Sequence, residues 1–279
     1  MPKLTKEILD DTTYCQLGLR LGPDSLDVMI YNPMQDNSII CESFAITSGN
    51  DRLKSLEEIV YDNPLLLSEY HKTNIVVETP TFCVVPSEVG DNDIAAELLY
   101  AAHPDCKDST DLIRNHVASL GVDFLTALSN KECNFLRRTF DNAPIRLNLA
   151  LLAYYYSAQL PKGNTAKIFV NLREHSADVL ALSCDRLLLA NRFEFREIAD
   201  IAYYIIAASE RVKSLSDDPQ AAAPEILVRG QRGERDELLS ALRTFCPTVM
   251  PMIFPSAMYR AGRDALNAPF DLIILPLCE

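Results

Sequence analysis

Three short polar turns carry side chains that can bind phosphate. Arg20 and Gly22 close an apolar run of the sequence, and Arg173 follows a second such run. Gly230 follows a third run. An arginine guanidinium can donate two parallel hydrogen bonds to a phosphate group, and a glycine lets the backbone approach a ligand closely. These turns are therefore the first candidates for a nucleotide or phosphate site.

The arginines at these turns also have a second interpretation, in which they only form ion pairs in a solvated network. Further arginines follow the third run, namely Arg229, Arg232 and Arg235. The carboxylates close to them in sequence are Glu174, Glu234, Asp236 and Glu237. Exposed ion pairs of this kind contribute little to stability. Both interpretations stay open at this point.

The first turn lies between elements that the sequence predicts in a clear order. Apolar runs separated by Gly, Pro, Asn and Asp are typical of hairpins, and helical spacing of Leu and Ile indicates a helix. The predicted elements are strands at residues 16–21, 25–31 and 38–46, a helix at 53–60 and a strand at 74–78.

The second and third turns lie in a copy of this order. The predicted elements are strands at residues 167–172, 177–183 and 187–195, a helix at 198–215 and a strand at 225–228. Each half therefore follows the pattern strand–strand–strand–helix–strand. A repeated pattern of this length predicts an α/β protein built from two similar halves.

The boundary between the halves is expected in the polar stretch at residues 161–164. We predict two domains, 1–162 and 163–279, with residues 86–161 as an inserted subdomain of the first. In that region the sequence predicts a helix at 93–102, strands at 123–128 and 135–140 and a helix at 145–159. After the second half, a helix is predicted near 234–244 and a last apolar strand at 272–275.

The three turns resemble the nucleotide loops of the actin, Hsp70 and sugar-kinase (ASKHA) superfamily. Residues 17–26 resemble its first phosphate loop, residues 170–179 the second, and residues 227–232 its adenosine turn. The resemblance implies a duplicated ribonuclease-H-like (actin-like ATPase) fold, with two β-β-β-α-β-α halves around a cleft. By the same resemblance the candidate cofactor-binding residues are Arg20, Gly22, Asp24, Ser25, Asn171, Arg173, His175, Ser176, Gly230 and Gln231.

A closer resemblance is to an uncharacterised bacterial family of unknown function with an actin-like ATPase fold. It is carried by residues 81–86, by the predicted helix after them and by the closing residues 275–279. That family has no assigned activity. The resemblance also implies a kinship to pilus-assembly members of the superfamily, which recruit partner peptides.

The loops depart from the superfamily pattern at the positions that matter for catalysis. Arg20 and Asn171 stand where the superfamily has an aspartate, and Arg173 stands in place of a glycine. Active members use the two aspartates to position Mg²⁺ and its waters, and phosphoryl transfer depends on this positioning. We therefore expect a degenerate nucleotide site that does not hydrolyse ATP.

Three functions remain as expectations. The first is a non-catalytic pseudo-ATPase, a scaffold or regulatory binding module for a protein partner or for itself. The second is a nucleotide or phosphometabolite sensor without turnover. The third is an active ATPase or kinase with relocated metal ligands such as Asp24 or Asp178. We expect no bound cofactor, with ATP as the alternative that the resemblance leaves open.

Composition and charge limit the classes of binding partner that we expect. The net charge of −13 disfavours binding to nucleic acid. No apolar run reaches the ~20 residues that span a bilayer, and the first residues lack a signal-peptide pattern.

Eight scattered cysteines without a Cys-x-x-Cys pair indicate reduced thiols and a cytoplasmic location. The spacing of His103, Cys106 and His116 fits no zinc motif, so no metal site is predicted.

Overall fold

The computed structural model describes residues 11–47, 49–160, 165–184, 186–215 and 222–278. By contacts the chain divides into two compact units. The first comprises the described residues within 1–116, 123–151 and 254–279, and the second those within 117–122 and 152–253. Each unit is treated by itself below.

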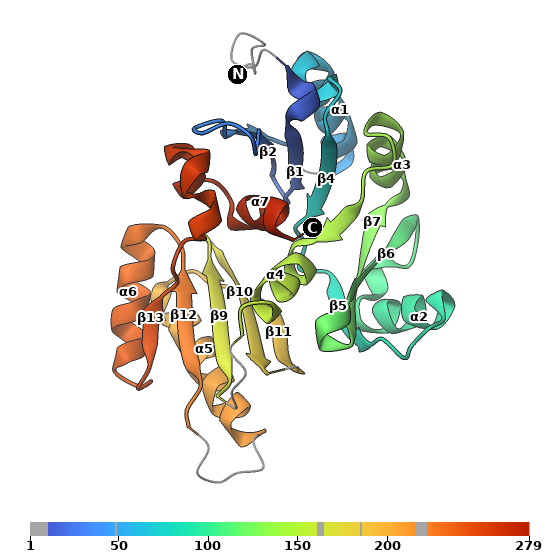
Figure 1. The fold of residues 1–279 in the computed structure, drawn as a ribbon. Coiled ribbons are helices and arrows are strands. Elements are labelled where there is room, and N and C mark those ends of the chain that lie inside the picture. The colour runs from blue at the N-terminus through green and yellow to red at the C-terminus, as the bar shows by residue number, and fades with distance from the viewer. Residues whose placement is uncertain (1–10, 48, 161–164, 185, 216–221, 279) are drawn as a thin grey trace. The chain divides into compact units, whose positions relative to one another are not determined.

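The first unit contains a mixed five-stranded sheet with the order β3-β2-β1-β4-β8. Figure 1 labels β1, β2 and β4 of this sheet. Its strands are β1 (Gln16–Leu21), β2 (Ser25–Tyr31), β3 (Ile40–Ala45), β4 (Lys72–Val77) and β8 (Ile145–Leu147). β1, β2 and β3 form an antiparallel meander, whereas β4 and β8 join parallel to β1. The turn between β1 and β2 therefore lies at the same edge of the sheet as the carboxyl end of β4.

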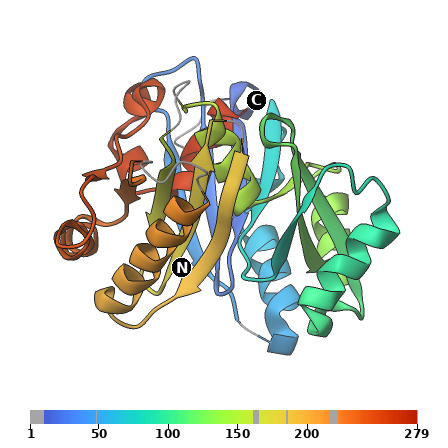
Figure 2. The same ribbon diagram turned by 90° about the horizontal axis from the view of Figure 1, so that it is seen from below.

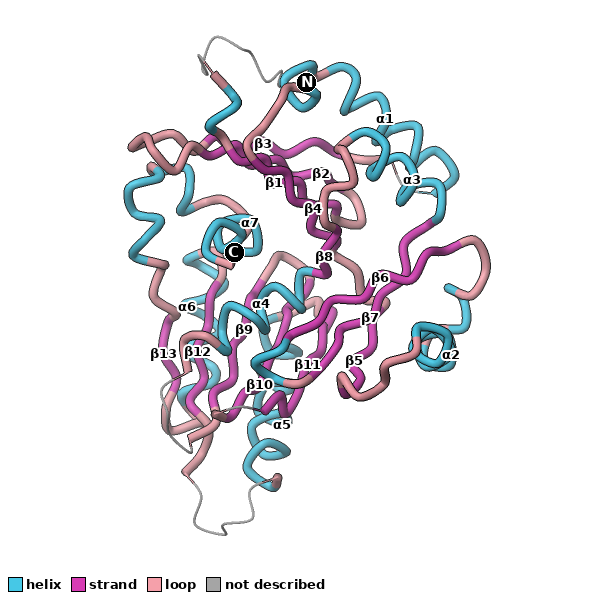
Figure 3. The backbone as a smooth tube through the Cα atoms, turned by 45° about the vertical axis from the view of Figure 1, so that its right-hand side comes forward, coloured by secondary structure: helices cyan, strands magenta, loops and turns pink. Residues whose placement is uncertain are grey.

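The two faces of this sheet pack on different helices (Figure 3). Leu17, Leu19 and Leu21 alternate along β1 and join the core formed with α1 (Arg52–Asp62) and α3 (Asn130–Thr139). The alternate residue Gly18 faces α7 (Phe270–Ile274), where an added Cβ would stand 3.2 Å from Cδ2 of Leu272. A glycine at this position thus lets the C-terminal helix lie close against β1.

A second sheet in the first unit has three strands in the order β5-β7-β6. Its elements are β5 (Phe82–Pro86), β6 (Thr110–Val117), β7 (Val122–Ser129) and α2 (Asn92–Ala102). α2 begins at Asp91, whose side chain accepts a hydrogen bond from the Asp93 amide, as an N-cap residue does. Buried Ala95 of α2 packs with Val85 and Leu125 of the sheet.

The second unit repeats the five-stranded pattern with the order β11-β10-β9-β12-β13. Its strands are β9 (Lys167–Leu172), β10 (Ser176–Ser183), β11 (Arg186–Glu194), β12 (Glu225–Arg229) and β13 (Val249–Pro251). Helices α5 (Ile198–Ser214) and α6 (Arg232–Arg243) cover one face (Figure 2). On the other face Tyr156 of α4 (Asn148–Ser157) stacks on Phe169, with ring centroids 4.1 Å apart.

Short 3₁₀ helices complete the described chain, at Thr12–Tyr14, Gly49–Asp51, Pro64–Leu67, Pro104–Cys106, Ala118–Leu120, Ser256–Ala261, Arg263–Leu266 and Leu275–Leu277. Within the described ranges, every helix is too short or too polar to cross a lipid bilayer.

The predicted duplication is confirmed, since both sheets share one strand order and one set of pairings. Two predicted strands were wrong. Residues 135–140 belong to α3 and the residue after it, and residues 272–275 belong to α7 and the 3₁₀ helix after it. Phe270 to Leu275 are buried on all sides, so the run shows no period that could tell a helix from a strand. The predicted helix at 145–159 begins later, because residues 145–147 form β8.

The bounds of the helices and strands do not test the predicted division into two domains. The expected boundary at residues 161–164 lies outside the described residues, and the division into 1–162 and 163–279 stays a prediction. By contacts, however, residues 254–279 group with the first unit. This grouping brings α7 to β1 and makes the C-terminal segment part of the first turn's surroundings.

Candidate functional site

The turn between β1 and β2 is closed by its own backbone. The Gly22 amide donates to the Ser25 carbonyl at 2.9 Å. Arg52, at the start of α1, donates to the Gly22 carbonyl at 2.7 Å and to the Pro23 carbonyl. Its Nε also pairs with Glu132 at 2.8 Å. The amide of the candidate residue Gly22 is therefore already used within the turn.

Arg20 is buried and is held by three carboxylates of its own unit. Its guanidinium pairs with Asp27 and Glu78, and its Nε donates to Oδ2 of Asp271 at 3.0 Å. The Arg20 side chain is 8% exposed, and that of Asp271 is fully buried. These four residues form what we call the Arg20 cluster.

The Arg20 cluster carries more negative than positive charge. Burial raises the pKa of the Asp27 carboxyl, hydrogen bonds from Ser43 and Ser25 lower it in part, and the charge of Asp271 raises it further. One guanidinium thus shares its charge among three carboxylates. A phosphate group brought to this place would meet net negative charge, which opposes binding.

Sheet register explains how the cluster assembles. Arg20 of β1 lies opposite Asp27 of β2, and Asp27 lies opposite Ser43 of β3. Glu78 directly follows β4, the parallel neighbour of β1. Asp271 comes from α7, which packs on the same face as Gly18.

Sequence reasoning missed the partners of Arg20, although a signal was present. Asp27 interrupts the apolar run of β2, and Asp271 interrupts the apolar run at the C-terminus. A charged residue inside such a run must be paired when the run is buried. That signal marks both residues as buried partners, but it does not say of which cation.

The turn between β9 and β10 has the same backbone closure and a different charge arrangement. The Arg173 amide donates to the Ser176 carbonyl at 2.8 Å. Asp178, fully buried, pairs with Nη2 of Arg173 at 3.1 Å and with Nη2 of Arg192 at 2.6 Å. One carboxylate therefore bridges two guanidiniums here, an arrangement we call the Asp178 bridge.

The third turn packs against the second. A Cβ added to Gly230 would lie 2.9 Å from Cβ of Leu172 and 3.2 Å from its carbonyl oxygen. β12 is the parallel neighbour of β9, so the turns after both strands share one edge of the sheet. Close packing within the unit therefore accounts for this glycine. Gln231 precedes α6, and its carbonyl accepts from the Arg235 amide at 2.9 Å.

The structure brings the predicted residues together in two groups, one in each unit. Arg20, Gly22, Asp24 and Ser25 lie at the first turn, and Asn171, Arg173, His175, Ser176, Gly230 and Gln231 lie at the second and third turns. Asp24, His175 and Gln231 are exposed, whereas Arg20, Gly22 and Asn171 are buried.

The ion-pair interpretation of the arginines holds in a modified form. Arg232 and Arg235 pair with Asp236 at 3.8 and 2.8 Å, as that interpretation expects. Arg20 and Arg173 pair instead with carboxylates on the neighbouring strand, Asp27 and Asp178. These pairs are buried or half-buried and form no solvated network.

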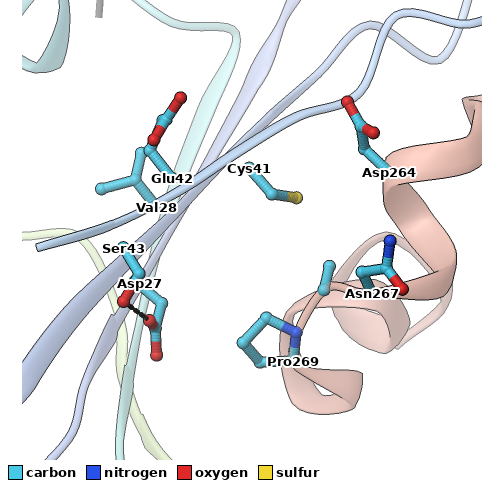
Figure 4. A pocket seen from close by; sticks show the side chains of 9 residues that line it. Asp27, Val28, Cys41, Glu42, Ser43, Asp264, Asn267 and Pro269 are labelled. Carbon is cyan, nitrogen blue, oxygen red and sulfur yellow. Dashed lines mark hydrogen bonds between the residues drawn. The ribbon is translucent and has the colours of Figure 1, made fainter. Parts of the chain in front are cut away.

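A pocket of about 220 Å³ lies beside the Arg20 cluster (Figure 4). It is lined by Asp27, Val28, Cys41, Glu42, Ser43, Asp264, Asn267, Ala268 and Pro269. Burial, together with the charges of Asp264, Asp27 and Glu42, raises the pKa of the Cys41 thiol to about 12. Cys41 is thus protonated at neutral pH and is no nucleophile. Carboxylates on three sides make the pocket unsuited to phosphate.

One other group of side chains resembles a reactive site. Ser87, His116 and Asp123 meet, but Ser87 and Asp123 both contact Nδ1 of His116, at 3.1 and 2.7 Å. A proton relay needs the base and its orienting carboxylate on opposite ring nitrogens. Burial would raise the pKa of Asp123, but hydrogen bonds from His116 and Arg114 outweigh it and lower that pKa. Over the described residues, no group of three His, Cys, Asp or Glu side chains has the geometry of a metal site.

Comparison with solved structures identifies the fold. The chain is similar to a protein from Bacteroides thetaiotaomicron VPI-5482 described as having an actin-like ATPase fold and unknown function, with a TM-score of 0.72 and 20% identity. That match covers 86% of this chain and 91% of the other. A second similar structure is the PilM–PilN type IV pilus biogenesis complex, with a TM-score of 0.53 and 11% identity over 96% of this chain and 98% of the other. The chain thus has the predicted actin-like ATPase fold.

A family model also matches the sequence, over residues 5–249, and its description is "protein of unknown function (DUF3822)". No curated protein matches the sequence significantly.

Proposed function

We propose that this chain, which belongs to the DUF3822 family of proteins of unknown function, is a non-catalytic actin-like protein, a pseudo-ATPase that serves as a scaffold or regulatory binding module. The Arg20 cluster is the observation that carries this proposal. Arg20 replaces the aspartate of the first phosphate loop, and its own three carboxylates occupy its guanidinium.

The Arg20 cluster disfavours the binding of Mg²⁺ and also that of the nucleotide's phosphates. Mg²⁺ needs carboxylate oxygens, and those of the cluster are already paired with a cation that sits among them. The phosphates need positive charge, and the cluster has an excess of negative charge. The relocated ligand Asp178, which would favour an active enzyme, pairs with two arginines and is fully buried.

A similar solved structure and an exposed tyrosine support the proposed binding role. One similar structure, PilM–PilN, is a complex, so this fold can serve in protein assembly. Tyr203 of α5 is 69% exposed, and exposed tyrosines favour interfaces. All eight cysteines are thiols rather than disulfides, which supports the further proposal that the protein works in the cytoplasm.

The second candidate is a phosphometabolite sensor located on the second unit alone. The Asp178 bridge has two guanidiniums for one carboxylate, and Arg173 is only partly buried, at 18% side-chain exposure. A small anion could bind to the exposed part of the Arg173 guanidinium. In this case Arg173, and not Arg20, would bind the ligand.

A thermal melt with ATP and Mg²⁺, repeated with ADP and without metal, tests the first proposal. A ligand at 100 times its dissociation constant stabilises a protein by about 2.7 kcal/mol, which raises the melting midpoint by about 5 °C or more at this size. We expect no shift of the melting midpoint, and no release of phosphate from ATP in a separate assay. A shift that requires Mg²⁺ would overturn the pseudo-ATPase proposal.

The sensor is tested by the same melt with inorganic phosphate and pyrophosphate, using Arg173→Ala against the matched control Arg235→Ala. A metal-independent shift that is lost only in Arg173→Ala would favour the sensor. An equal shift in both variants and the unaltered protein would remove Arg173 from consideration.

A further inference from the structure

Helix α2 has two apolar sides, and only one is covered by its own unit. Ala95 and Leu99 are fully buried toward the three-stranded sheet. Ile94 and Leu98, one turn apart on the outer side, are 52% and 43% exposed. Ala101 continues this line at helical spacing and is also exposed. We call Ile94, Leu98 and Ala101 the α2 stripe.

Carboxylates surround the α2 stripe. Asp93 and Glu97 on the helix are exposed, as is the N-cap residue Asp91. Glu88, which precedes the helix, adds a further carboxylate. α2 contains no lysine or arginine. The apolar stripe therefore lies in a field of negative charge.

Arg114 holds the start of α2 in place and is already paired. Arg114 of β6 donates to the Val89 and Gly90 carbonyls at 2.5 and 3.1 Å and to Oδ1 of Asn92 at 3.2 Å. It also pairs with Asp123. These contacts fix the start of α2, so the stripe is presented on a preformed helix and binding would cost little ordering entropy.

We propose that the α2 stripe docks a basic amphipathic helix of a partner protein. Such a helix has apolar residues at positions i, i+3 or i+4 and i+7, flanked by lysines and arginines. Its apolar residues would cover Ile94 and Leu98, and its cations would meet Asp91, Asp93 and Glu97. The small Ala101 leaves room for the two helices to approach closely. This inference deepens the proposed binding role and rests on it.

Charge decides between this partner and a second copy of the chain. Two α2 stripes packed on one another would bring their carboxylates together without a cation on either helix, which opposes association. A basic helix replaces that repulsion by attraction. The affinity should therefore fall as salt is added.

The test uses the full chain and a fluorescent synthetic helix of leucine and lysine, with leucine on one face. Fluorescence anisotropy measures its dissociation constant. A second helix with glutamate in place of lysine tests the role of charge. The variant Ile94→Asp with Leu98→Asp removes the stripe. Its matched control is Met250→Asp with Ile253→Asp, which changes two exposed apolar residues of the second unit by the same charge.

We expect saturable binding of the basic helix with one site per chain. The stripe variant should weaken it at least about tenfold, because it loses two apolar anchors and places carboxylates against the leucines of the partner helix. The control variant should stay within about twofold of the unaltered protein. Circular dichroism confirms that both variants fold.

Three results would overturn the inference. Undiminished binding of the basic helix by the stripe variant would mean that the acidic protein attracts cations without a site. Equal binding of the glutamate helix would remove the charge argument. A dimer of the chain that disappears in the stripe variant would assign the surface to a second copy. None of these readouts involves nucleotide, so the pseudo-ATPase proposal can fail or hold separately.

Discussion

The β1–β2 and β9–β10 hairpins share a backbone plan and pair their buried charges differently. Arg20 and Asn171 are each the fifth residue of the first strand, and Asp27 and Asp178 are each the third residue of the second. Both turns close with one amide-to-carbonyl hydrogen bond. In the first hairpin a guanidinium lies among three carboxylates, whereas in the second a carboxylate lies between two guanidiniums.

The difference comes from residues outside the hairpins. Glu78 and Asp271 make the first hairpin acidic, and they come from the end of β4 and from α7. Arg192, which comes from β11, is the second guanidinium on Asp178. The duplicated strands therefore share the place where a charge can be buried, while the neighbouring elements decide its sign and surplus.

The largest effect is expected from Arg20→Met. Arg20→Met removes the cation that pairs with three buried carboxylates, which should destabilise the first unit by about 3–5 kcal/mol. Urea denaturation measures the change. The matched variant Arg192→Met should cost less, because Asp178 keeps Arg173. Equal costs would contradict the proposed asymmetry of the two hairpins.

The second-largest loss of stability is expected from Asp178→Asn. It removes the charge that two guanidiniums share, at a cost of about 3 kcal/mol. Hydrogen exchange of β9 and β10 should report the loss in the second unit, while β1 and β2 keep their protection. Unchanged exchange in β9 would mean that the bridge contributes little.

Gly230→Ala should cost about 1–3 kcal/mol by overpacking, because its Cβ would approach Cβ of Leu172 to 2.9 Å. A thermal melt measures this. A stability equal to that of the unaltered protein would show that the turn can move away from Leu172.

A smaller effect is expected in the pH dependence of stability, to which Asp27 of the first hairpin contributes. Because the pKa of Asp27 is raised in the folded chain, that chain binds a proton more tightly, and stability falls as the pH rises from the unfolded pKa through the folded one. Asp27→Asn should remove this fall. A pKa raised by one corresponds to a loss of about 1.4 kcal/mol. Denaturation at several pH values tests it, and the same fall in the variant would assign it to another group.

The smallest effect is expected for Gly22→Ala. The φ angle of Gly22 is not positive, and an added Cβ would lie 3.3 Å from the flexible Oγ of Ser25. The change should stay within about 1 kcal/mol. A larger loss in the melt would show that this glycine is needed for more than the turn.

Prediction from sequence worked best where structure is local. Alternation in residues 16–31 and 167–183 predicted both hairpins, and helical spacing predicted α1 and α5. It failed at residues 272–275, where uniform burial hides the period. At the candidate site it located the turns and Arg20, but it did not find the partners of Arg20, because pairing across the fold leaves no spacing to read.

The sequence by itself determined the duplicated α/β fold, because periodicity is a local property, and through the resemblance it predicted loops that lack the two aspartates of the superfamily. Only the tertiary structure decided what Arg20 does. Its partner Asp271 lies 251 positions away in the chain and reaches it through the packing of α7 on β1. A buried charge must find its counter-charge in space, and that distance in space is set by the fold.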